Sequence, residues 1–423
     1  MKQKITSLAI AGIMSLVFIA CSKNSLPKAP SKLQGDLISQ WNETAYESFG
    51  GTQYQHSLQA ARLNAMVHLA MHDALNAIEN KYERYAFTGK DRKADPVVAA
   101  SYAAYTVLLN QVPAKKNFLD SALAYRLHGI DMDDAQLRGI ELGKAAAQAV
   151  LIKRLNDGAD ADPIGVVVPS VEPGVYQVVP PFNFVFAPTW VNMKLFSLQS
   201  KDQFRPAPHP ALNSAAYATA FNEVKATGRL LSDERTADQS AYTTFWYEFS
   251  EAGWNRVARV TSAAKKLNLL EAARLFALVD VAMADAYTAG WDAKFHYNFW
   301  RPYTAIRNAA SDGNDATQAD PEWEPFMPTP PVQDYPSTHS ALGNAAATVL
   351  ARLLGDQTAF SMSAPTAQPN TPRNFTSFSQ AANENADSRV RAGIHFRFSC
   401  EAGQKLGNKI GNWVVDKTLA PVK

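Results

Sequence analysis

The chain has 423 residues, 47% of them hydrophobic, and its 41 basic and 39 acidic residues give a formal net charge of +2 at pH 7. A chain of this length and apolar content can bury a large core. The near balance of charge gives no reason to expect nucleic acid or an anionic membrane surface as a partner. Positive charge must therefore act locally, at particular sites.

The first 20 residues read as a secretory leader: Lys2 and Lys4 precede an apolar stretch that is too short to span a membrane. The run Phe18-Ile19-Ala20-Cys21 resembles a bacterial lipobox, which implies that Cys21 becomes the acylated first residue. An ordinary signal peptide with an incidental cysteine is the alternative. We expect an exported protein, lipid-anchored on the periplasmic or surface side of a bacterial membrane, with residues 21–37 as a tether.

The two cysteines restrict how the protein is stabilised. Only Cys400 follows Cys21, so an intramolecular disulfide framework is excluded for the exported chain. Residues 1–20 hold two lysines and no acid, so their removal leaves a formally neutral chain. Stability must come from a packed core.

Helical periodicity dominates the rest of the sequence. Helices are predicted over Ala60–Asn80, Pro96–Gln111, Asp133–Asp157, Ala211–Gly228, Arg235–Phe249, Val257–Leu269, Glu271–Phe295, Ser340–Leu354, Ser377–Ala392 and Cys400–Thr418. These elements predict an all-α fold over residues 38–423, either one large domain or two packed bundles joined through residues 164–210.

Irregular segments separate the predicted helices. Ile164–Trp190 alternates Val, Pro, Gly and aromatic residues, which favours either a small hairpin or an extended cover loop. Ser311–Pro336 and Ser361–Asn374 are rich in Pro, Asp and Asn and are predicted to be loops.

The first chemically informative string is Lys294-x6-Arg301-Pro302. A spacing of seven residues places both cations on one face of a helix, which we expect to end at Arg301 because Pro302 disfavours helical geometry before it. Aromatic neighbours such as Trp300 favour burial, and buried cations require a counter-charge. A solvated basic face is the alternative.

The second string, Pro336-Ser337-Thr338-His339, lies between a Pro-rich loop and a small-residue helix. Free backbone N–H groups at a helix start bind anions. Ser337 offers a hydroxyl, Thr338 its backbone N–H, and His339 a group for acid–base chemistry. Alternatively, Ser337 or Thr338 is a simple N-cap and His339 is exposed.

The third string runs from Ser388-Arg389 to His395. Gly393 lets the chain change direction, so Arg389 and His395 can converge. Arg389 can donate to two oxygens of an anion, which leaves His395 to bond the central atom. Together the three strings predict a site for a tetrahedral oxyanion.

These strings, in this order, resemble the signature of the vanadium-dependent haloperoxidase and type 2 phosphatidic acid phosphatase superfamily. The flanking residues resemble its soluble bacterial haloperoxidase branch, notably Trp291–Pro302, Thr329-Pro330-Pro331, Gln203–Pro206 and the helical run Ala65–Ala74. The resemblance extends from about residue 42 to residue 413.

The resemblance implies an all-helical fold that binds one vanadate, whose place phosphate can take. His395 would be the axial vanadium ligand and His339 would handle protons as peroxide binds. The oxygens would be held by Lys294, Arg301, Ser337, the Thr338 N–H and Arg389. Hydrogen peroxide would then oxidise a halide to a hypohalous species. A small organic acceptor is the alternative partner to the halide.

Two positions depart from the family pattern. Thr338 stands where Gly is usual, which adds a side chain and a conformational constraint near the anion. Ser399 stands where the family commonly has an Asp that orients the histidine, so we expect His395 to be a weaker ligand.

Two other functions remain open from the sequence. An acid phosphatase would use His395 as the nucleophile and His339 as the leaving-group acid. A surface lipoprotein could instead keep the scaffold and bind a ligand without chemistry, and Ser399 is the best support for that reading.

Elsewhere the signals are weaker. His68 and His72, with Asp73, could face a metal, but a packed core helix is the better interpretation because no upstream acid completes a metalloprotease motif. His296 either lines the pocket or points away.

Overall fold

The computed structural model describes residues 36–367, 369 and 371–422. The predicted leader and Cys21 lie outside the described residues, as does almost all of the predicted tether. Helix α1 begins at Asp36, so the last two residues assigned to the tether belong to the fold.

The all-α fold class is confirmed. The helices are α1 (Asp36–Phe49), α2 (Ser57–Glu79), α3 (Pro96–Gln111), α4 (Lys116–Arg126), α5 (Asp134–Lys153), α6 (Ala215–Thr227), α7 (Ala237–Phe245), α8 (Ser250–Lys265), α9 (Leu269–Tyr297), α10 (Pro302–Arg307), α11 (Thr338–Leu354), α12 (Phe378–Arg391) and α13 (Arg397–Lys417). Two short antiparallel pairs complete it, β1 (Ile164–Gly165) with β2 (Val185–Phe186), and β3 (Phe360–Met362) with β4 (Arg373–Phe375).

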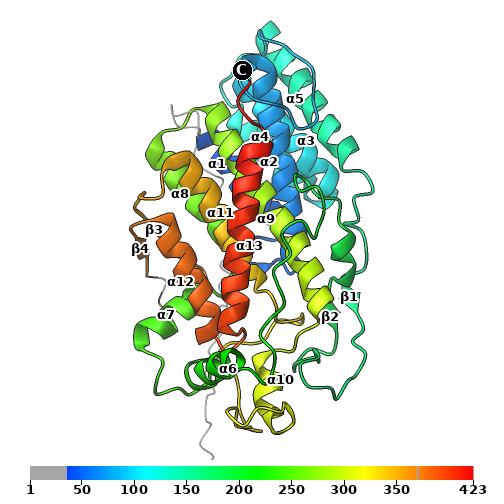
Figure 1. The fold of residues 1–423 in the computed structure, drawn as a ribbon. Coiled ribbons are helices and arrows are strands. Elements are labelled where there is room, and N and C mark those ends of the chain that lie inside the picture. Colours follow the sequence, from blue (N-terminus) through cyan, green and yellow to red (C-terminus); the bar gives the residue numbers. More distant parts are fainter. Residues whose placement is uncertain (1–35, 368, 370, 423) are drawn as a thin grey trace, which may run out of the picture.

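Helix α9 is the central element of the fold. It begins with a capping box in which the Asn268 and Glu271 side chains bond each other's backbone N–H, and apart from Glu271 its side chains are buried from Leu269 to Lys294. On one side it packs against α2, which packs in turn on α3 and α5; on the other side it packs against α11 and α13 (Figure 1). A helix buried all round can position polar groups away from water.

Helices α11 and α13 make an especially close pair because α13 presents glycines to α11. A Cβ atom on Gly407 would lie 2.1 Å from the Ala341 carbonyl oxygen, and one on Gly403 would lie 2.2 Å from that of Ser337. The absence of a Cβ atom therefore lets α13 lie directly against the start of α11. This contact fixes the second string beside the third.

The predicted end of α9 is wrong. The helix stops at Tyr297 because Asn298 adopts the left-handed conformation (φ 45°) and caps it. Arg301 is instead the residue before α10, which Pro302 begins. Lys294 and Arg301 therefore do not share one helical face, and their side chains approach the site from different elements.

Other differences are local. Helices α1, α4 and α10 have no counterpart among the predicted helices, and β3 and β4 pair inside a segment predicted to be a loop. The β1–β2 pair bears out the hairpin alternative for residues 164–190 only in part, because each strand has two residues.

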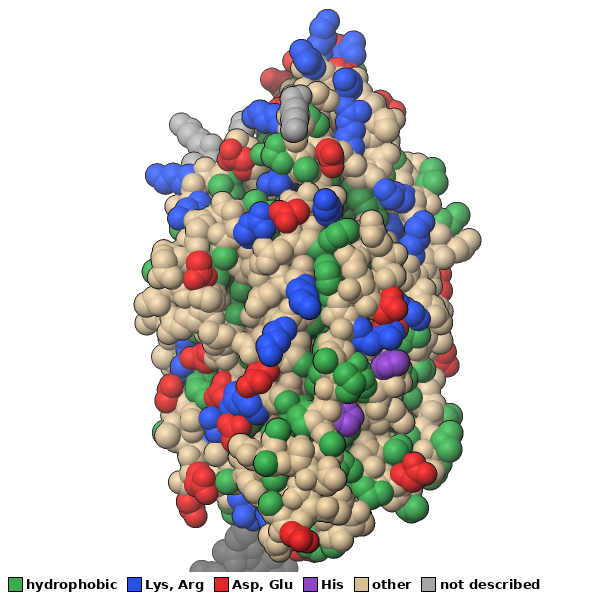
Figure 2. Space-filling view, in the orientation of Figure 1, with side chains coloured by type: hydrophobic (Ala, Val, Ile, Leu, Met, Phe, Trp, Pro, Cys, Tyr) green, Lys and Arg blue, Asp and Glu red, His purple; other side chains and the backbone are tan. Residues whose placement is uncertain are grey.

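The surface carries no dominant charge on the face seen in Figure 2, where basic and acidic side chains are intermixed. Across the described part of the chain, we find no helix with the length and apolar character needed to cross a bilayer.

Candidate active site

Hydrogen bonds to backbone oxygens tie the first string to the other two. The Arg301 guanidinium donates through Nη1 to the Ile394 carbonyl at 2.6 Å. The Lys294 ammonium donates to the carbonyls of Gln333 (2.5 Å) and Asp334 (3.0 Å), just before the second string. An ammonium has three N–H donors, so one of them is left for a ligand.

The backbone joins the second string to the first turn of α13, which follows the third string. The Ser337 N–H donates to the Ser399 carbonyl at 2.9 Å. Ser337 is the N-cap of α11 and accepts from the Ser340 N–H (3.4 Å) and hydroxyl (3.0 Å), so its own hydroxyl hydrogen is free to donate. As the first residue of α11, Thr338 has a backbone N–H without an acceptor inside the helix.

Three buried cations converge at this point. Lys294 is 0% exposed, Arg301 1% and Arg389 4%. Burial is the main cause that lowers the pKa of each, for Arg389 to about 10. Nε of Arg389 is buried and has no hydrogen-bond partner among the described residues. Unsatisfied donors and charge of this kind favour an anion as the ligand of the cluster.

The one carboxylate that we find in contact with this cluster, within the described chain, is Asp334. It is fully buried, and burial raises its pKa to about 6 although the charges of Arg301 and Lys294 act in the opposite direction. A single carboxylate cannot balance three cations, so the site keeps an excess of positive charge.

His395 lies between a cation and that carboxylate. Its Nε2 is 3.0 Å from Arg301 Nη1, and because guanidinium only donates, Nε2 must carry the lone pair. Its Nδ1 lies 2.8 Å from Asp334 Oδ1, within ion-pair distance although not aligned for a hydrogen bond. Burial, then Arg301 and Lys294, lower the pKa of His395 well below its usual value. A neutral imidazole whose Nε2 carries the lone pair is the form that ligates metals.

Ser399 acts through the same carboxylate. Its hydroxyl donates to Asp334 Oδ2, on the far side of the carboxyl group from His395. Asp334, on the loop before α11, gives His395 a charged neighbour that Ser399 does not supply. The expectation that His395 is a weaker ligand stays a prediction.

His339 faces the cluster from α11. Its Nε2 donates to the Trp246 carbonyl at 2.8 Å, and Arg389 Nη1 lies 3.5 Å from the same oxygen. The proton on Nε2 leaves the lone pair on Nδ1. Burial, then the charge of Arg389, lower the pKa of His339 well below its usual value, so the imidazole is neutral and can accept a proton.

Thr338 fits because α9 makes room for it. A Cβ atom on Gly290 would lie 2.3 Å from the Thr338 methyl carbon, so the methyl group occupies the space that Gly290 leaves. Thr338 also starts a regular helix and needs no unusual backbone angle. The backbone constraint that was expected because Thr338 replaces the usual glycine is therefore absent.

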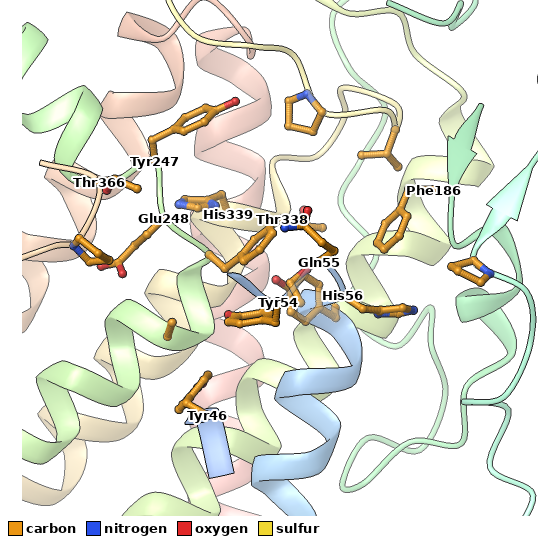
Figure 3. Close-up of a pocket in the computed structure, with 18 of the residues that line it drawn as sticks. Tyr46, Tyr54, Gln55, His56, Phe186, Tyr247, Glu248, Thr338, His339 and Thr366 are labelled. Atoms are coloured by element: carbon orange, nitrogen blue, oxygen red, sulfur yellow. The ribbon is translucent and has the colours of Figure 1, made fainter. Parts of the chain in front are cut away.

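The cluster opens into a cavity of about 1710 Å³, lined on this side by Arg301, Thr338, His339, Arg389 and His395. Figure 3 shows His339 and Thr338 at the wall of this cavity, with Tyr247 and Glu248 beyond them. Lys294 and Ser337 lie behind the wall, where both are completely buried.

The histidines of α2 are core residues. His68 and His72 are 0% exposed, and His68 Nδ1 lies 2.6 Å from Asp280. Within the part of the chain that the structure describes, no group of three His, Cys, Asp or Glu side chains could hold a metal ion. His296 is exposed and points away from the cavity.

Sequence reasoning missed three contributors to the site: Asp334, Gly290 and the Trp246 carbonyl. The sequence held a signal for Asp334, because this acid lies two residues before a string that carries two hydroxyl groups and an imidazole. No sequence signal pointed to Gly290 or Trp246, since their roles depend on which segment packs against them.

Comparisons with known proteins show what the chain is similar to. Residues 274–423 match the family model described as the VCPO second helical-bundle domain. The vanadium chloroperoxidase of Curvularia inaequalis is 27% identical in an alignment 297 residues long, and the match covers 53% of this chain. The chain spans about half (48%) of the length of that relative.

Two solved structures share the fold over most of the chain. A bacterial vanadium-dependent iodoperoxidase superposes with a TM-score of 0.79 at 24% identity, covering 93% of this chain and 99% of its own. An apo-type bacterial vanadium-dependent chloroperoxidase gives a TM-score of 0.68 at 17% identity, covering 85% and 93%.

Proposed function

Because this chain belongs to the vanadium haloperoxidase superfamily, we propose that it binds vanadate and uses hydrogen peroxide to oxidise a halide to a hypohalous species. The observation that carries the proposal is the buried cluster of Lys294, Arg301 and Arg389, which Asp334 alone cannot neutralise. A small, highly charged oxyanion suits such a cluster.

The donor set fits vanadate. Arg389 has an unpaired buried Nε, and Lys294 has one N–H left over. These groups, with Arg301, the Ser337 hydroxyl and the Thr338 N–H, would hold the oxygens. His395 would ligate vanadium through Nε2. Phosphate has the same shape and charge and would compete for the same donors.

When bound, vanadate supplies Lewis-acid activation of hydrogen peroxide without a change in its own oxidation state. The chain supplies charge and proton transfer. The three cations stabilise negative charge on the oxygens, which makes the activated oxygen electrophilic toward halide. His339 takes the proton of the incoming peroxide at Nδ1 and returns a proton to the leaving oxygen.

The two competing functions rest on weaker support. A non-catalytic binding scaffold depended on Ser399, and Asp334 now provides the charge that Ser399 lacks. An acid phosphatase would use the same donors, so the deciding measurement must compare both reactions.

The test is a paired assay of the purified protein. One arm measures iodide oxidation by hydrogen peroxide with added vanadate, because iodide is the most easily oxidised of the usual halides. The other arm measures hydrolysis of p-nitrophenyl phosphate without vanadate. We expect activity in the first arm, its loss in His395→Ala, and its retention in the control His296→Ala, since His296 is exposed. Activity in the hydrolysis arm alone would refute the proposal.

We also propose that the protein is exported and anchored through Cys21, as the lipobox-like run indicates. Mass spectrometry of the mature amino terminus and fractionation of cells test this directly. An acylated Cys21 in the membrane fraction is expected, and Cys21→Ser should release the protein. A membrane-independent wild-type protein would contradict the anchor.

A further inference from the structure

A buried carboxyl group beside the cavity has no part in the function proposed above. Glu251 lies in the first turn of α8 and is completely buried. Its two oxygens accept hydrogen bonds from the Tyr54 hydroxyl at 2.5 Å and the Tyr287 hydroxyl at 2.8 Å. Among the described residues we find no cation paired with Glu251, so its side-chain partners are neutral groups that can exchange protons.

The groups that surround Glu251 favour its protonated form. Burial is the main cause that raises the pKa of Glu251 to about 7, and the charge of Glu248 acts in the same direction, although the two tyrosine hydroxyls act in the opposite one. Cations on the same helix are engaged elsewhere: Arg256 binds both oxygens of Glu248, and Arg259 lies 3.4 Å from a carboxylate of α1. Tyr46 of α1, also near Glu251, keeps its proton because burial raises its pKa well above the ordinary value.

Tyr287 reaches from α9 to the cavity on the side of the anion cluster. It lines the cavity together with His339 and Arg389, and it lies one helical turn before the glycine of α9 that packs on Thr338. Burial raises the pKa of Tyr287 well above its ordinary value, and the charge of Arg389 is among the causes that act in the opposite direction. Tyr287 therefore contacts Glu251 on one side and the cavity of the cluster on the other.

Two further contacts hold Glu251 close to the cluster and to the cavity. The Ser250 hydroxyl donates to the His339 carbonyl at 3.4 Å, so α8 begins against the first turn of α11. Tyr54, the other hydroxyl partner of Glu251, lines the same cavity (Figure 3). Both tyrosines bonded to Glu251 thus face the cavity, and Glu251 connects them from behind its wall.

The protonation state of Glu251 decides where the tyrosine protons point. An ionised carboxylate only accepts hydrogen bonds, so both hydroxyls then donate to it. A protonated carboxyl group donates to one of the two hydroxyls, and the tyrosine that accepts this bond can turn its own hydrogen toward the cavity. Protonated Glu251 therefore allows Tyr287 to act as a donor toward the cluster.

The proposed reaction needs a proton that His339 does not supply. Hydrogen peroxide and a halide give water and a hypohalite anion, since His339 takes one proton from the peroxide and returns it to the oxygen that leaves as water. The three cations of the cluster would hold a hypohalite anion. One further proton per turnover converts this anion to neutral hypohalous acid, which leaves more easily.

We propose that Tyr287 and Glu251 deliver this proton. Tyr287 donates its hydroxyl proton to the hypohalite oxygen as the carboxyl proton of Glu251 moves to the Tyr287 oxygen. An O–H bond forms on the hypohalous acid, the O–H bond of Glu251 breaks, Tyr287 ends neutral, and no electrons are exchanged. Glu251, left as a carboxylate, recovers a proton from solvent through Tyr54. The transfer rests on the proposed function, whereas the protonation of Glu251 does not.

Infrared spectroscopy tests the proton on Glu251 without vanadate and without turnover. We expect a carboxyl C=O band that is absent from Glu251→Gln, fades as pH rises through about 7, and shifts in Tyr287→Phe because one hydrogen bond is lost. Glu47→Gln is the matched control and should leave the band unchanged, since Glu47 lines the same cavity but is exposed. A wild-type spectrum without this band below the pKa of Glu251 would overturn the proposal.

The pH dependence of turnover tests the transfer itself. With vanadate, iodide and peroxide saturating, kcat of the wild type should fall as pH rises above about 7. Below that pH, Glu251→Gln and Tyr287→Phe should each lower kcat about 100-fold and leave it level with pH, with KM for iodide unchanged. Tyr46→Phe is the control and should keep the wild-type profile.

The outcomes separate this proposal from the proposed function. A Glu251→Gln variant with the kcat and pH profile of the wild type would overturn proton delivery while leaving halide oxidation intact. A wild-type protein that does not oxidise iodide would refute the proposed function and the transfer with it, and the infrared result for Glu251 would still stand.

Discussion

Asp334 places a carboxylate oxygen 2.8 Å from Nδ1 of His395, and the Ser399 hydroxyl donates to the other oxygen of the same carboxylate. The acid comes from the loop before α11 and the histidine from the turn before α13. The charge beside the imidazole thus comes from a different part of the chain than the family pattern suggests.

Replacing Asp334 with Asn should lower vanadate affinity by about 10- to 100-fold, since a partner of a ligating histidine that fixes its orientation has effects of this size. Titration calorimetry with vanadate measures it. Ser399→Ala should have a smaller effect, because it removes only a hydroxyl that holds Asp334. Equal affinity of wild type and Asp334→Asn would show that this carboxylate does not support His395.

His339→Ala should reduce the turnover of iodide oxidation by at least about 100-fold, because the lone pair on Nδ1 is lost as a proton acceptor. Vanadate affinity should change little, since His339 donates to the Trp246 carbonyl and not to the anion. Steady-state kinetics at saturating vanadate separates the two quantities. A large loss of affinity with normal turnover would assign His339 to binding.

Gly290→Ala should destabilise the protein by about 1–3 kcal/mol, since the new methyl group would meet the Thr338 side chain at 2.3 Å. Thr338→Gly should relieve the clash, so the double variant should lose less stability than Gly290→Ala alone. Urea unfolding of the four proteins gives the coupling energy. Simple additivity would mean that the two residues do not share this space.

Glu251 should make stability depend on pH. It is fully buried and accepts from the Tyr54 (2.5 Å) and Tyr287 (2.8 Å) hydroxyls, and burial raises its pKa to about 7. The folded state therefore holds its proton to higher pH than the unfolded state does. Stability falls as pH rises from about 4.5 to about 7, by roughly 3 kcal/mol, and is level above that range.

Glu251→Gln removes this titration. Relative to wild type, the variant should gain most of that roughly 3 kcal/mol between pH 5 and pH 8. Unfolding by urea at the two pH values gives the difference, and Glu47→Gln, at an exposed position, is the control. A difference that does not change with pH would mean that Glu251 stays ionised in the folded protein.

Which residues lie together was easier to predict from the sequence than which helix or loop carries each of them. The three strings predicted that Lys294, Arg301, Arg389, His339 and His395 meet, because cations and imidazoles in this order suit one oxyanion. The structure brings these residues together. The helical face proposed for Lys294 and Arg301 failed because Asn298 can adopt a left-handed conformation, and an asparagine does so only where packing favours it. Such choices depend on tertiary contacts.

Local sequence patterns did not predict the residues that compensate for the two departures from the family pattern, Thr338 and Ser399. From the sequence, Thr338 is expected to constrain the backbone, but Gly290 packs against its methyl group and leaves room for it. Ser399 is expected to remove a charge near His395, but Asp334 lies beside His395. In both cases the compensating residue lies far away in sequence. Only the packing of α9, α11 and the third string brings the pairs together.

The most direct test of the account is a crystal structure of the protein soaked in vanadate. We predict one vanadium atom at the cluster, bonded to Nε2 of His395, with oxygens within hydrogen-bond distance of Lys294, Arg301 and Arg389. Vanadate bound elsewhere, or at the cluster with the His395 ring turned away from the metal, would contradict it.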